Sequence, residues 1–283
     1  MKKVALLTDS TTYLPTALKE KFSISSVPLA VIWGEETFED GVTISPSEFY
    51  TRLKASKIMP STSQPSVGKM HAALTSLLEQ DYAILGIFLS SKLSGTVQSA
   101  RQAREMLPAG SPVEIVDSET TTLAMGLHLL AAARAAAAGA SLAECRAIAE
   151  AARQKTGVYF MVDTLEFLHR GGRIGGAQRF LGTALNMKPV LCMHQGKIES
   201  LERVRTKSKA VERLIELVAE KCHDQTSIRL AAAHANAPDE ARAMLERAAA
   251  RLNPVETLLG ELSPVIGTHV GPGTLALAYQ AGL

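Results

Sequence analysis

The sequence predicts an α/β fold with two domains: an N-terminal domain built on a parallel sheet and a C-terminal α/β domain. First, apolar strand-like runs at residues 4–7, 83–89 and 113–116 each lead into a cluster of Ser, Thr or Asp, and helix-like segments follow. This alternation is typical of parallel strands flanked by helices. Second, the pattern changes after Gly157, and 283 residues are long enough for two domains. We therefore predict domains at residues 1–157 and 158–283.

The overall composition is that of a globular protein and excludes several classes. Thirty basic residues against 28 acidic ones give a net charge of +2, which is too weak a field to indicate nucleic acid as a partner. Three widely spaced cysteines without a CxxC pair, Cys145, Cys192 and Cys222, are typical of a reduced protein with structural thiols.

Neither a signal peptide nor a membrane span is expected. The apolar run at residues 4–7 meets Thr8 and Asp9 at once, so it is too short for the core of a signal peptide. The longest apolar stretch, residues 123–138, contains His128 and Arg134 and falls short of a span. We expect a soluble, cytoplasmic protein, with a monomer as the default.

Helices in the first half are marked by their N-terminal residues. Ser45-Pro46-Ser47-Glu48 and Ser141-Leu142-Ala143-Glu144 match the capping box, and Ser66 precedes apolar residues at helical spacing in residues 67–79. The Ala-rich stretch 123–153 is predicted to form two helices that break at residues 139–141.

In the second half, strands and helices again alternate. Residues 189–193 and 196–201 predict a β-hairpin around His194-Gln195-Gly196, and residues 266–274 predict a strand end that passes into the glycine-rich start of a terminal helix. Residues 175–187 predict a short helix, either packed or acting as a lid that touches a membrane. Further strands are predicted at 158–162, 227–234 and 255–261, and helices at 207–221 and 238–252.

Polar turns follow the predicted strands, and the carboxyl ends of parallel strands are where α/β proteins bind ligands. In residues 90–96, Ser94, Gly95 and Thr96 offer hydroxyls and free backbone N–H groups to a small anion. Taken alone, an ordinary helix N-cap explains this turn better.

Three other turns carry similar groups. Residues 60–66 hold hydroxyls between two prolines, although Ser and Pro are also common turn residues. In residues 168–174 a Gly-Gly corner lies between Arg170 and Arg173, which either face an anion or lie on the surface. His269 lies in residues 266–274, and a lone histidine more often has a structural role.

Five of these segments occur in order along nearly the whole chain. They are Asp9-Ser10-Thr11, Thr62-Ser63-Gln64-Pro65-Ser66, Leu89-Ser90-Ser91 with Leu93-Ser94-Gly95-Thr96, Gly171-Gly172-Arg173-Ile174 and Gly267-Thr268-His269-Val270-Gly271-Pro272-Gly273. Together they resemble the DegV family. The resemblance implies a non-catalytic protein of phospholipid metabolism that holds one long-chain fatty acid, such as palmitate or oleate, with its tail buried between the two domains.

The resemblance also implies a partner and a set of residues. A separate ATP-dependent fatty acid kinase would convert the presented carboxylate to an acyl phosphate. No cofactor and no metal are implied. Residues implied to hold the carboxylate are Thr62, Ser63, Ser94, Gly95 and His269, with Ser10, Arg173 and Arg205 as accessory ligand or partner contacts. Some relatives have a second threonine where this chain has Ser63; chain-length preference and the tail-lining residues follow from no motif.

Three other functions are weaker hypotheses. A serine-dependent acyl hydrolase would use Ser94 as nucleophile and His269 as base, but no GxSxG motif surrounds Ser94 and the sequence does not identify an acidic partner. Nucleotide binding is a weaker hypothesis because the sequence contains neither of the phosphate-binding motifs GxxxxGK[ST] and GxGxxG. Metal-dependent hydrolysis lacks HExxH.

Overall fold

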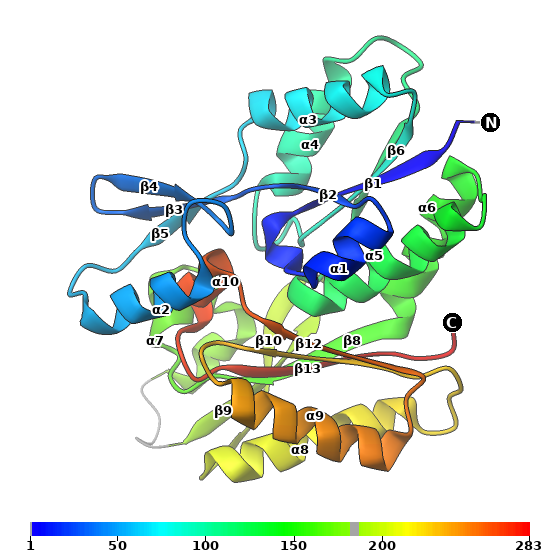
Figure 1. The fold of residues 1–283 in the computed structure, drawn as a ribbon. Coiled ribbons are helices and arrows are strands. Elements are labelled where there is room, and N and C mark those ends of the chain that lie inside the picture. Colours follow the sequence, from blue (N-terminus) through cyan, green and yellow to red (C-terminus); the bar gives the residue numbers. More distant parts are fainter. Residues whose placement is uncertain (1, 182–186) are drawn as a thin grey trace.

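The first layer of the protein is a parallel sheet. The computed structural model describes residues 2–181 and 187–283, and its N-terminal sheet has the strand order β2-β1-β6-β7 (Figure 1). Every strand pair in this sheet is parallel, as predicted. Its strands are β1 (Val4–Asp9), β2 (Ser25–Val27), β6 (Ala83–Phe88) and β7 (Val113–Asp117).

Helices cover both faces of this sheet. Helices α3 and α4 pack together on one face, and α5 and α6 pack on the other. The predicted break between α5 and α6 is confirmed: Gly139 lies in the turn at a φ of 90°, and Ser141 and Glu144 form the expected capping box. The helices of this half are α1 (Thr16–Lys21), α2 (Pro46–Ala55), α3 (Val67–Glu79), α4 (Thr96–Glu105), α5 (Thr122–Ala137) and α6 (Leu142–Lys155), with a 3₁₀ turn η1 (Ser10–Thr12).

A small antiparallel sheet that the sequence patterns did not reveal projects beside α2. It has the order β4-β3-β5 and consists of β3 (Ala30–Trp33), β4 (Glu36–Glu39) and β5 (Ser61–Ser63). Its buried Trp33 packs against Phe49 of α2, with ring centroids 5.5 Å apart. Strands of three or four residues carry too few side chains for a period of two to stand out in the sequence.

The second layer is a mixed six-stranded sheet with the order β10-β9-β8-β13-β11-β12. Only β11 and β12 run parallel, and α8 and α9 cover the outer face (Figure 1). The predicted hairpin is confirmed as β9 and β10. The elements are β8 (Thr156–Met161), β9 (Lys188–His194), β10 (Lys197–Val204), β11 (Arg229–His234), β12 (Glu256–Glu261), β13 (Leu275–Gln280), α8 (Lys207–Cys222) and α9 (Pro238–Leu252).

The prediction for residues 266–274 is wrong in the order of its elements. The segment begins inside a helix, α10 (Pro264–Val270), turns at Gly271 and Gly273, and then enters strand β13. The Leu and Ala side chains of β13 suggest a helix locally. Strand β13 nevertheless lies between β8 and β11, where small buried side chains such as Ala276 fit the crowded centre of the sheet.

The prediction of a helical lid over residues 175–187 is tested only in part. After α7 (Glu166–Arg170), the chain forms a 3₁₀ turn η2 (Gly175–Phe180), which packs on β10. Residues 182–186 lie outside the described residues.

Helix α5 lies between the two sheets. It packs on β1 and β6 of the first sheet and on β8, β11 and β13 of the second. Residues 122–130 are all buried, as expected for a helix that is covered on every side. The domain boundary at Gly157 stays a prediction, since Gly157 is the second residue of β8 and α5 belongs to one hydrophobic core that includes side chains of both sheets.

Within the described residues, the helices are all too short or too polar to cross a bilayer.

Candidate functional site

A chamber with mostly apolar walls lies where the two halves of the chain meet. It encloses about 840 Å³ of space not filled by protein atoms, part of it open to solvent. A volume of several hundred cubic ångströms is usual for a small-molecule site. Its apolar walls are formed by Leu29, Leu89, Leu93, Val158, Phe160, Leu168, Met193, Ile198, Leu262, Val265, Ile266, Val270 and Ala276.

One part of the wall is polar, and we call Thr62, Ser94, Arg173 and His269 the polar corner. Strand β5 supplies Thr62 and helix α10 supplies His269, and their side chains are joined by a hydrogen bond of 2.8 Å between Oγ1 and Nε2. The two residues are 207 positions apart, so this bond connects the two halves of the chain. The structure therefore brings together two residues that the sequence analysis assigned to one site.

Ser94 enters the polar corner from the turn before α4. Its hydroxyl lies 2.9 Å from Thr96 Oγ1, and it accepts a longer bond of 3.4 Å from the Thr96 backbone N–H. The N-cap residue of α4 is Gly95, which has no side chain, and Ser94 is the residue whose hydroxyl accepts from the first N–H of the helix. The turn thus brings the Ser94 hydroxyl to the chamber beside the N-terminus of α4, an arrangement that favours an anion.

Arg173 connects the turn before α4 to the Gly-Gly corner. Its Nε donates to the carbonyl of Leu93 at 3.1 Å, and its Nη1 donates to the carbonyl of Gly171 at 2.6 Å. The guanidinium is held by two backbone carbonyls rather than by a carboxylate, so its positive charge remains available to the chamber. Arg170 points elsewhere and pairs with Glu166.

His269 is largely buried and electrically neutral at pH 7. Burial, with a smaller contribution from the charge of Arg173, lowers its pKa to about 4. Its Nδ1 is buried without a partner among the described residues, and it lies directly over Gly171, where a Cβ would approach Nδ1 to 2.1 Å. A neutral imidazole in this position has one donor and one acceptor nitrogen.

Asp40 fixes the start of the helix that carries His269. Its buried carboxylate accepts bonds from Ser10 Oγ at 2.7 Å and from the Val265 N–H at 3.3 Å, and Ser263 also bonds to it. Burial raises the pKa of Asp40 to about 6, and the neighbouring charge of Asp9 adds to the effect. Asp40 lies far from Val265 in the sequence, so no local pattern could have indicated this contact.

Three of the sequence candidates lie away from the chamber. Ser63 follows Thr62 in β5, so it faces the other side, and its hydroxyl donates to the Gln64 carbonyl at 3.2 Å. Ser10 binds Asp40 and accepts from the Leu29 N–H at 3.1 Å. Arg205 is exposed directly after the end of β10.

Other lining residues were not identified as site residues from the sequence. Gln64 lies at the chamber and packs over Gly95, where a Cβ would lie 3.0 Å from its Nε2. Thr121 and Thr122 reach the chamber at the start of α5, and buried Thr122 adopts a φ of 57°. A positive φ in a β-branched residue is strained and often marks a functional position. For Gln64, the sequence feature that could have indicated a site residue was its position among the hydroxyl side chains of residues 60–66.

The described residues contain no group of three or more His, Cys, Asp or Glu that could hold a metal ion. The donors at the polar corner are hydroxyls, an imidazole and a guanidinium, which suit an anionic or hydrogen-bonding organic group.

Fold and site together define the class of protein: an α/β protein with an apolar chamber between two sheets and a polar corner built from both halves. The family model described as "Uncharacterised protein, DegV family" matches residues 3–282. The chain belongs to the DegV family. Protein DegV of Bacillus subtilis is 37% identical over 278 residues, which are 98% of each chain.

Solved structures of relatives have the same fold. A DegV family protein from Thermus thermophilus, described for its fatty acid binding, superposes with a TM-score of 0.93 at 36% identity and covers 99% of both chains. DegV from Bacillus subtilis, described as a fatty acid binding protein, has a TM-score of 0.90 at 35% identity, covering 99% of this chain and 100% of its own.

Proposed function

We propose that this protein binds one long-chain fatty acid, such as palmitate or oleate, with its tail in the apolar chamber and its carboxylate at the polar corner. The observation that carries the proposal is the chamber itself, whose apolar walls meet Thr62, Ser94, Arg173 and His269 at one place. The fatty acid binding described for the relatives from Thermus thermophilus and Bacillus subtilis supports it.

The chamber suits such a ligand energetically. A C16 tail has about 15 CH₂ and CH₃ groups, and at about 0.8 kcal/mol each their burial supplies on the order of 10 kcal/mol before the costs of association. The tail thus provides affinity. The carboxylate needs donors, because an unpaired charge in an apolar site costs several kcal/mol.

The polar corner supplies these donors from four segments. The hydroxyls of Thr62 and Ser94 and the N–H groups at the start of α4 would hold the carboxylate, and His269 would fix the Thr62 hydroxyl through their 2.8 Å bond. Arg173 supplies a compensating charge from a position held by Leu93 and Gly171. Ser63 takes no part in this arrangement.

The bound acid would be presented to a separate fatty acid kinase rather than processed by this chain. Hydroxyl donors leave a carboxylate oxygen able to attack a phosphoryl donor, whereas a bidentate arginine would occupy both oxygens. A kinase would dock near the chamber mouth, and Arg205 is the exposed residue that we propose for that contact. The protein would work in the cytoplasm, with brief contact to a membrane surface when it exchanges ligand.

The alternative function, acyl hydrolysis by Ser94 and His269, fits the geometry less well. The imidazole Nε2 bonds to Thr62, whereas the Ser94 hydroxyl lies beside Thr96. A serine nucleophile needs its base within hydrogen-bond reach. Turnover of acyl esters that disappears in Ser94→Ala would favour the hydrolase.

Mass spectrometry of lipid extracted from the purified protein tests the central proposal. We expect one fatty acid per chain, or uptake of added oleate or palmitate to that ratio. A protein that yields no fatty acid and takes up neither acid does not have this function.

Substitutions at the polar corner test the site. Ser94→Ala and Thr62→Val each remove one hydroxyl donor to a charged group, so we expect fatty acid affinity to fall about tenfold. Ser63→Ala is the matched control, since its hydroxyl faces away from the chamber, and it should bind as the wild type does. Affinities are measured by displacement of a fluorescent fatty acid. If all three variants bind equally, the hydroxyls of Ser94 and Thr62 do not bind the carboxylate.

Phosphorylation is measured separately, in a reconstituted assay with a fatty acid kinase and ATP. Acyl phosphate should form only when this protein carries the acid, and Arg205→Ala should slow the reaction without changing fatty acid affinity. Equal rates with and without this protein would refute presentation while leaving binding intact.

A further inference from the structure

A second, more polar cavity lies beside the chamber. It encloses about 500 Å³ of space not filled by protein atoms, part of it open to solvent. Helices α5 and α6, the loop after β7, strand β8 and the tip of the β9–β10 hairpin form its walls. We call it the side cavity.

Two buried residues of the side cavity have polar atoms without partners. His128 is 2% exposed and Thr120 is 7% exposed, and both imidazole nitrogens and the Thr120 hydroxyl have no hydrogen-bond partner among the described residues. Buried polar groups are nearly always paired, so such a cluster needs a ligand or ordered water to complete it.

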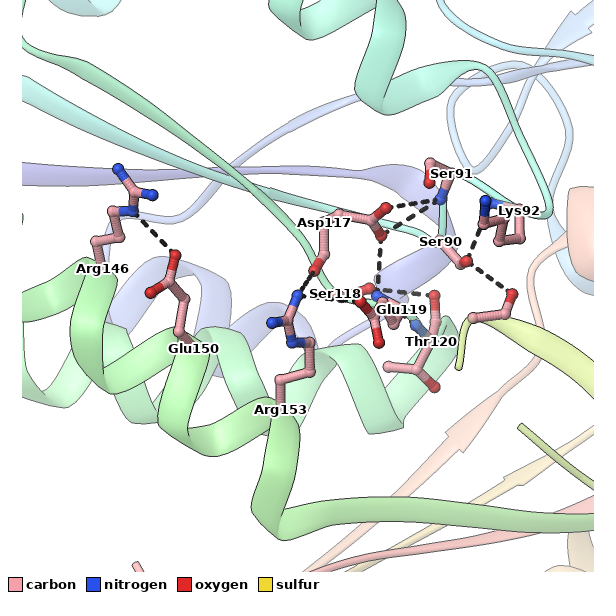
Figure 2. Close-up of polar contacts among 11 residues, drawn as sticks. Ser90, Ser91, Lys92, Asp117, Ser118, Glu119, Thr120, Arg146, Glu150 and Arg153 are labelled. Atoms are coloured by element: carbon pink, nitrogen blue, oxygen red, sulfur yellow. Dashed lines mark hydrogen bonds and ion pairs between the residues drawn. The ribbon is translucent and has the colours of Figure 1, made fainter. Parts of the chain in front are cut away.

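The unpaired hydroxyl does not result from a loosely held loop. The Thr120 N–H donates to Ser118 Oγ at 3.3 Å, and the Thr120 carbonyl accepts from the Ser90 N–H at 2.8 Å. Figure 2 shows this loop, with Ser90 on one side and Arg153 reaching it from α6. The backbone around Thr120 is thus fixed while its side chain is left without a partner.

The charges around the side cavity favour an uncharged ligand. Arg153 is within 3.3 Å of the Glu119 carboxylate, so its charge is balanced within the site (Figure 2). Burial, with a smaller effect of Arg153, lowers the pKa of His128 to about 3, so the ring is neutral. A neutral imidazole has one donor and one acceptor, and a threonine hydroxyl both donates and accepts. A hydroxyl donates one hydrogen bond and accepts two, so it can bond to one imidazole nitrogen of His128 and to the Thr120 hydroxyl at the same time.

The side cavity adjoins the proposed fatty acid chamber. Val158 and Met193 line both spaces, so these two side chains form the wall between them. Val158 and Phe160 lie on one face of β8, where Phe160 pairs with Ala276 and Val158 with Ala278, farther along β13 from α10. The shared wall therefore lies along the chamber away from His269. Methionine is the most adaptable apolar side chain, and a rotation of Met193 would join the two spaces.

We propose that the side cavity receives a hydroxyl group on the acyl chain, so that the ligands of this protein include hydroxylated long-chain fatty acids. The inference rests on the proposed function, because the carboxylate end of the same molecule would lie at the polar corner. His128 and Thr120 would form hydrogen bonds with this hydroxyl, one as acceptor and the other as donor. A wholly apolar chamber would exclude a hydroxylated acid, because the hydroxyl would be buried without a partner.

The test compares C18 acids by displacement of a fluorescent fatty acid: stearate and stearates hydroxylated at C10, C12 or C18. In the wild type, at least one hydroxylated acid should bind as tightly as stearate or up to about fivefold tighter, because one neutral hydrogen bond contributes that much. Thr120→Val keeps the shape and removes the hydroxyl, so its preference should shift about tenfold toward stearate. His128→Leu should shift it the same way.

Thr75→Val is the matched control. The Thr75 hydroxyl also lacks a partner among the described residues, but it lies on α3, away from both cavities, so the ratio of affinities should not change. If every hydroxylated acid binds at least tenfold more weakly than stearate to the wild type, or if Thr120→Val and Thr75→Val give the same ratio, the side cavity holds ordered water only. A failure of stearate itself to bind refutes the proposed function instead.

Discussion

At the scale of residues, the polar corner depends on how closely His269 packs on Gly171. The imidazole lies where a Cβ of residue 171 would be, 2.1 Å from Nδ1. Gly171 itself has an ordinary helical backbone, with a φ of −73°, so alanine is conformationally allowed there. Glycine is therefore required for space rather than for backbone freedom, and His269 occupies that space.

Gly171→Ala tests this packing. The new methyl group displaces the ring and breaks its 2.8 Å bond to Thr62, so we expect at least a tenfold loss of fatty acid affinity with a folded protein. Affinity is measured by displacement of a fluorescent fatty acid, and folding by circular dichroism. Gly68→Ala in α3 is the control, because a Cβ there would meet only Ser66 Oγ, at an ordinary contact distance of 3.9 Å. Unchanged affinity in Gly171→Ala would show that the position of His269 is unimportant.

At this scale the sequence indicated Thr62, Ser94, Arg173 and His269 as candidates for one site, and their role in holding a carboxylate stays a prediction. All four line the chamber, although Ser94 and Arg173 come from loops, Thr62 comes from strand β5 and His269 comes from helix α10. Ser63 and Thr62 have the same chemistry and adjacent positions. Only the pairing of β5 with β3, absent from any local pattern, decides that Thr62 faces the chamber.

At the scale of elements, helix α10 connects the two halves of the chain at the site, because its His269 bonds to Thr62 of the first half. It is seven residues long, lines the chamber with Val265, Ile266, His269 and Val270, and begins at the N-cap Ser263. The Asp40 carboxylate binds this first turn and the Ser10 hydroxyl together. A helix so short has little stability of its own, so its position depends on this contact and on packing.

Asp40→Ala should therefore loosen α10 without altering any residue of the chamber. The loss of an acceptor for Ser10 Oγ and the Val265 N–H should cost about 1–3 kcal/mol in the free energy of unfolding, since buried donors lose their partner. Amide exchange in α10 should become faster, and fatty acid affinity should fall.

The adjacent substitution Glu39→Ala is the control, because Glu39 pairs with Lys69 at the surface. If the amides of α10 exchange at the wild-type rate in Asp40→Ala, packing alone positions the helix.

Elements with strong local signals were predicted, and those shaped by distant contacts were not. The capping boxes at Ser45 and Ser141 mark helices that form as expected. The local sequence of β13 predicts a helix, because Ala and Leu favour helices. Its pairing with β8 and β11 makes it a strand. The sheet β4-β3-β5 is too short to show a period.

At the scale of the whole molecule, four buried groups make opposing contributions to the pH dependence of stability. Burial raises the pKa of Asp9 and of Asp40 to about 6, so the folded state binds more protons than the unfolded state between the ordinary pKa of 3.8 and 6. These carboxyls add stability as pH falls through 6. Burial lowers the pKa of His128 to about 3 and of His269 to about 4. These two histidines therefore lower the free energy of unfolding of the protein as pH falls below 6.5.

Near pH 5 the carboxyls and the histidines act in opposite directions, and Asp9→Asn should expose the contribution of the histidines. Without the Asp9 carboxyl, the folded state binds about one proton fewer than it does in the wild type, so stability should fall by about 1.4 kcal/mol per unit of decreasing pH relative to the wild type. The measurement is the free energy of unfolding in urea at pH 4.5, 5, 5.5 and 6. Parallel profiles for the variant and the wild type would contradict the balance.

The place of β13 has a consequence for synthesis of the protein on the ribosome. Strands β8 and β11 flank β13 and are translated before it, as are α5 and the loops of the first half. Until α10 and β13 emerge, two strand edges remain open and the chamber lacks a wall, a state that invites association with other chains. A nascent chain therefore has no complete chamber, and chaperone protection matters most just before β13 is added.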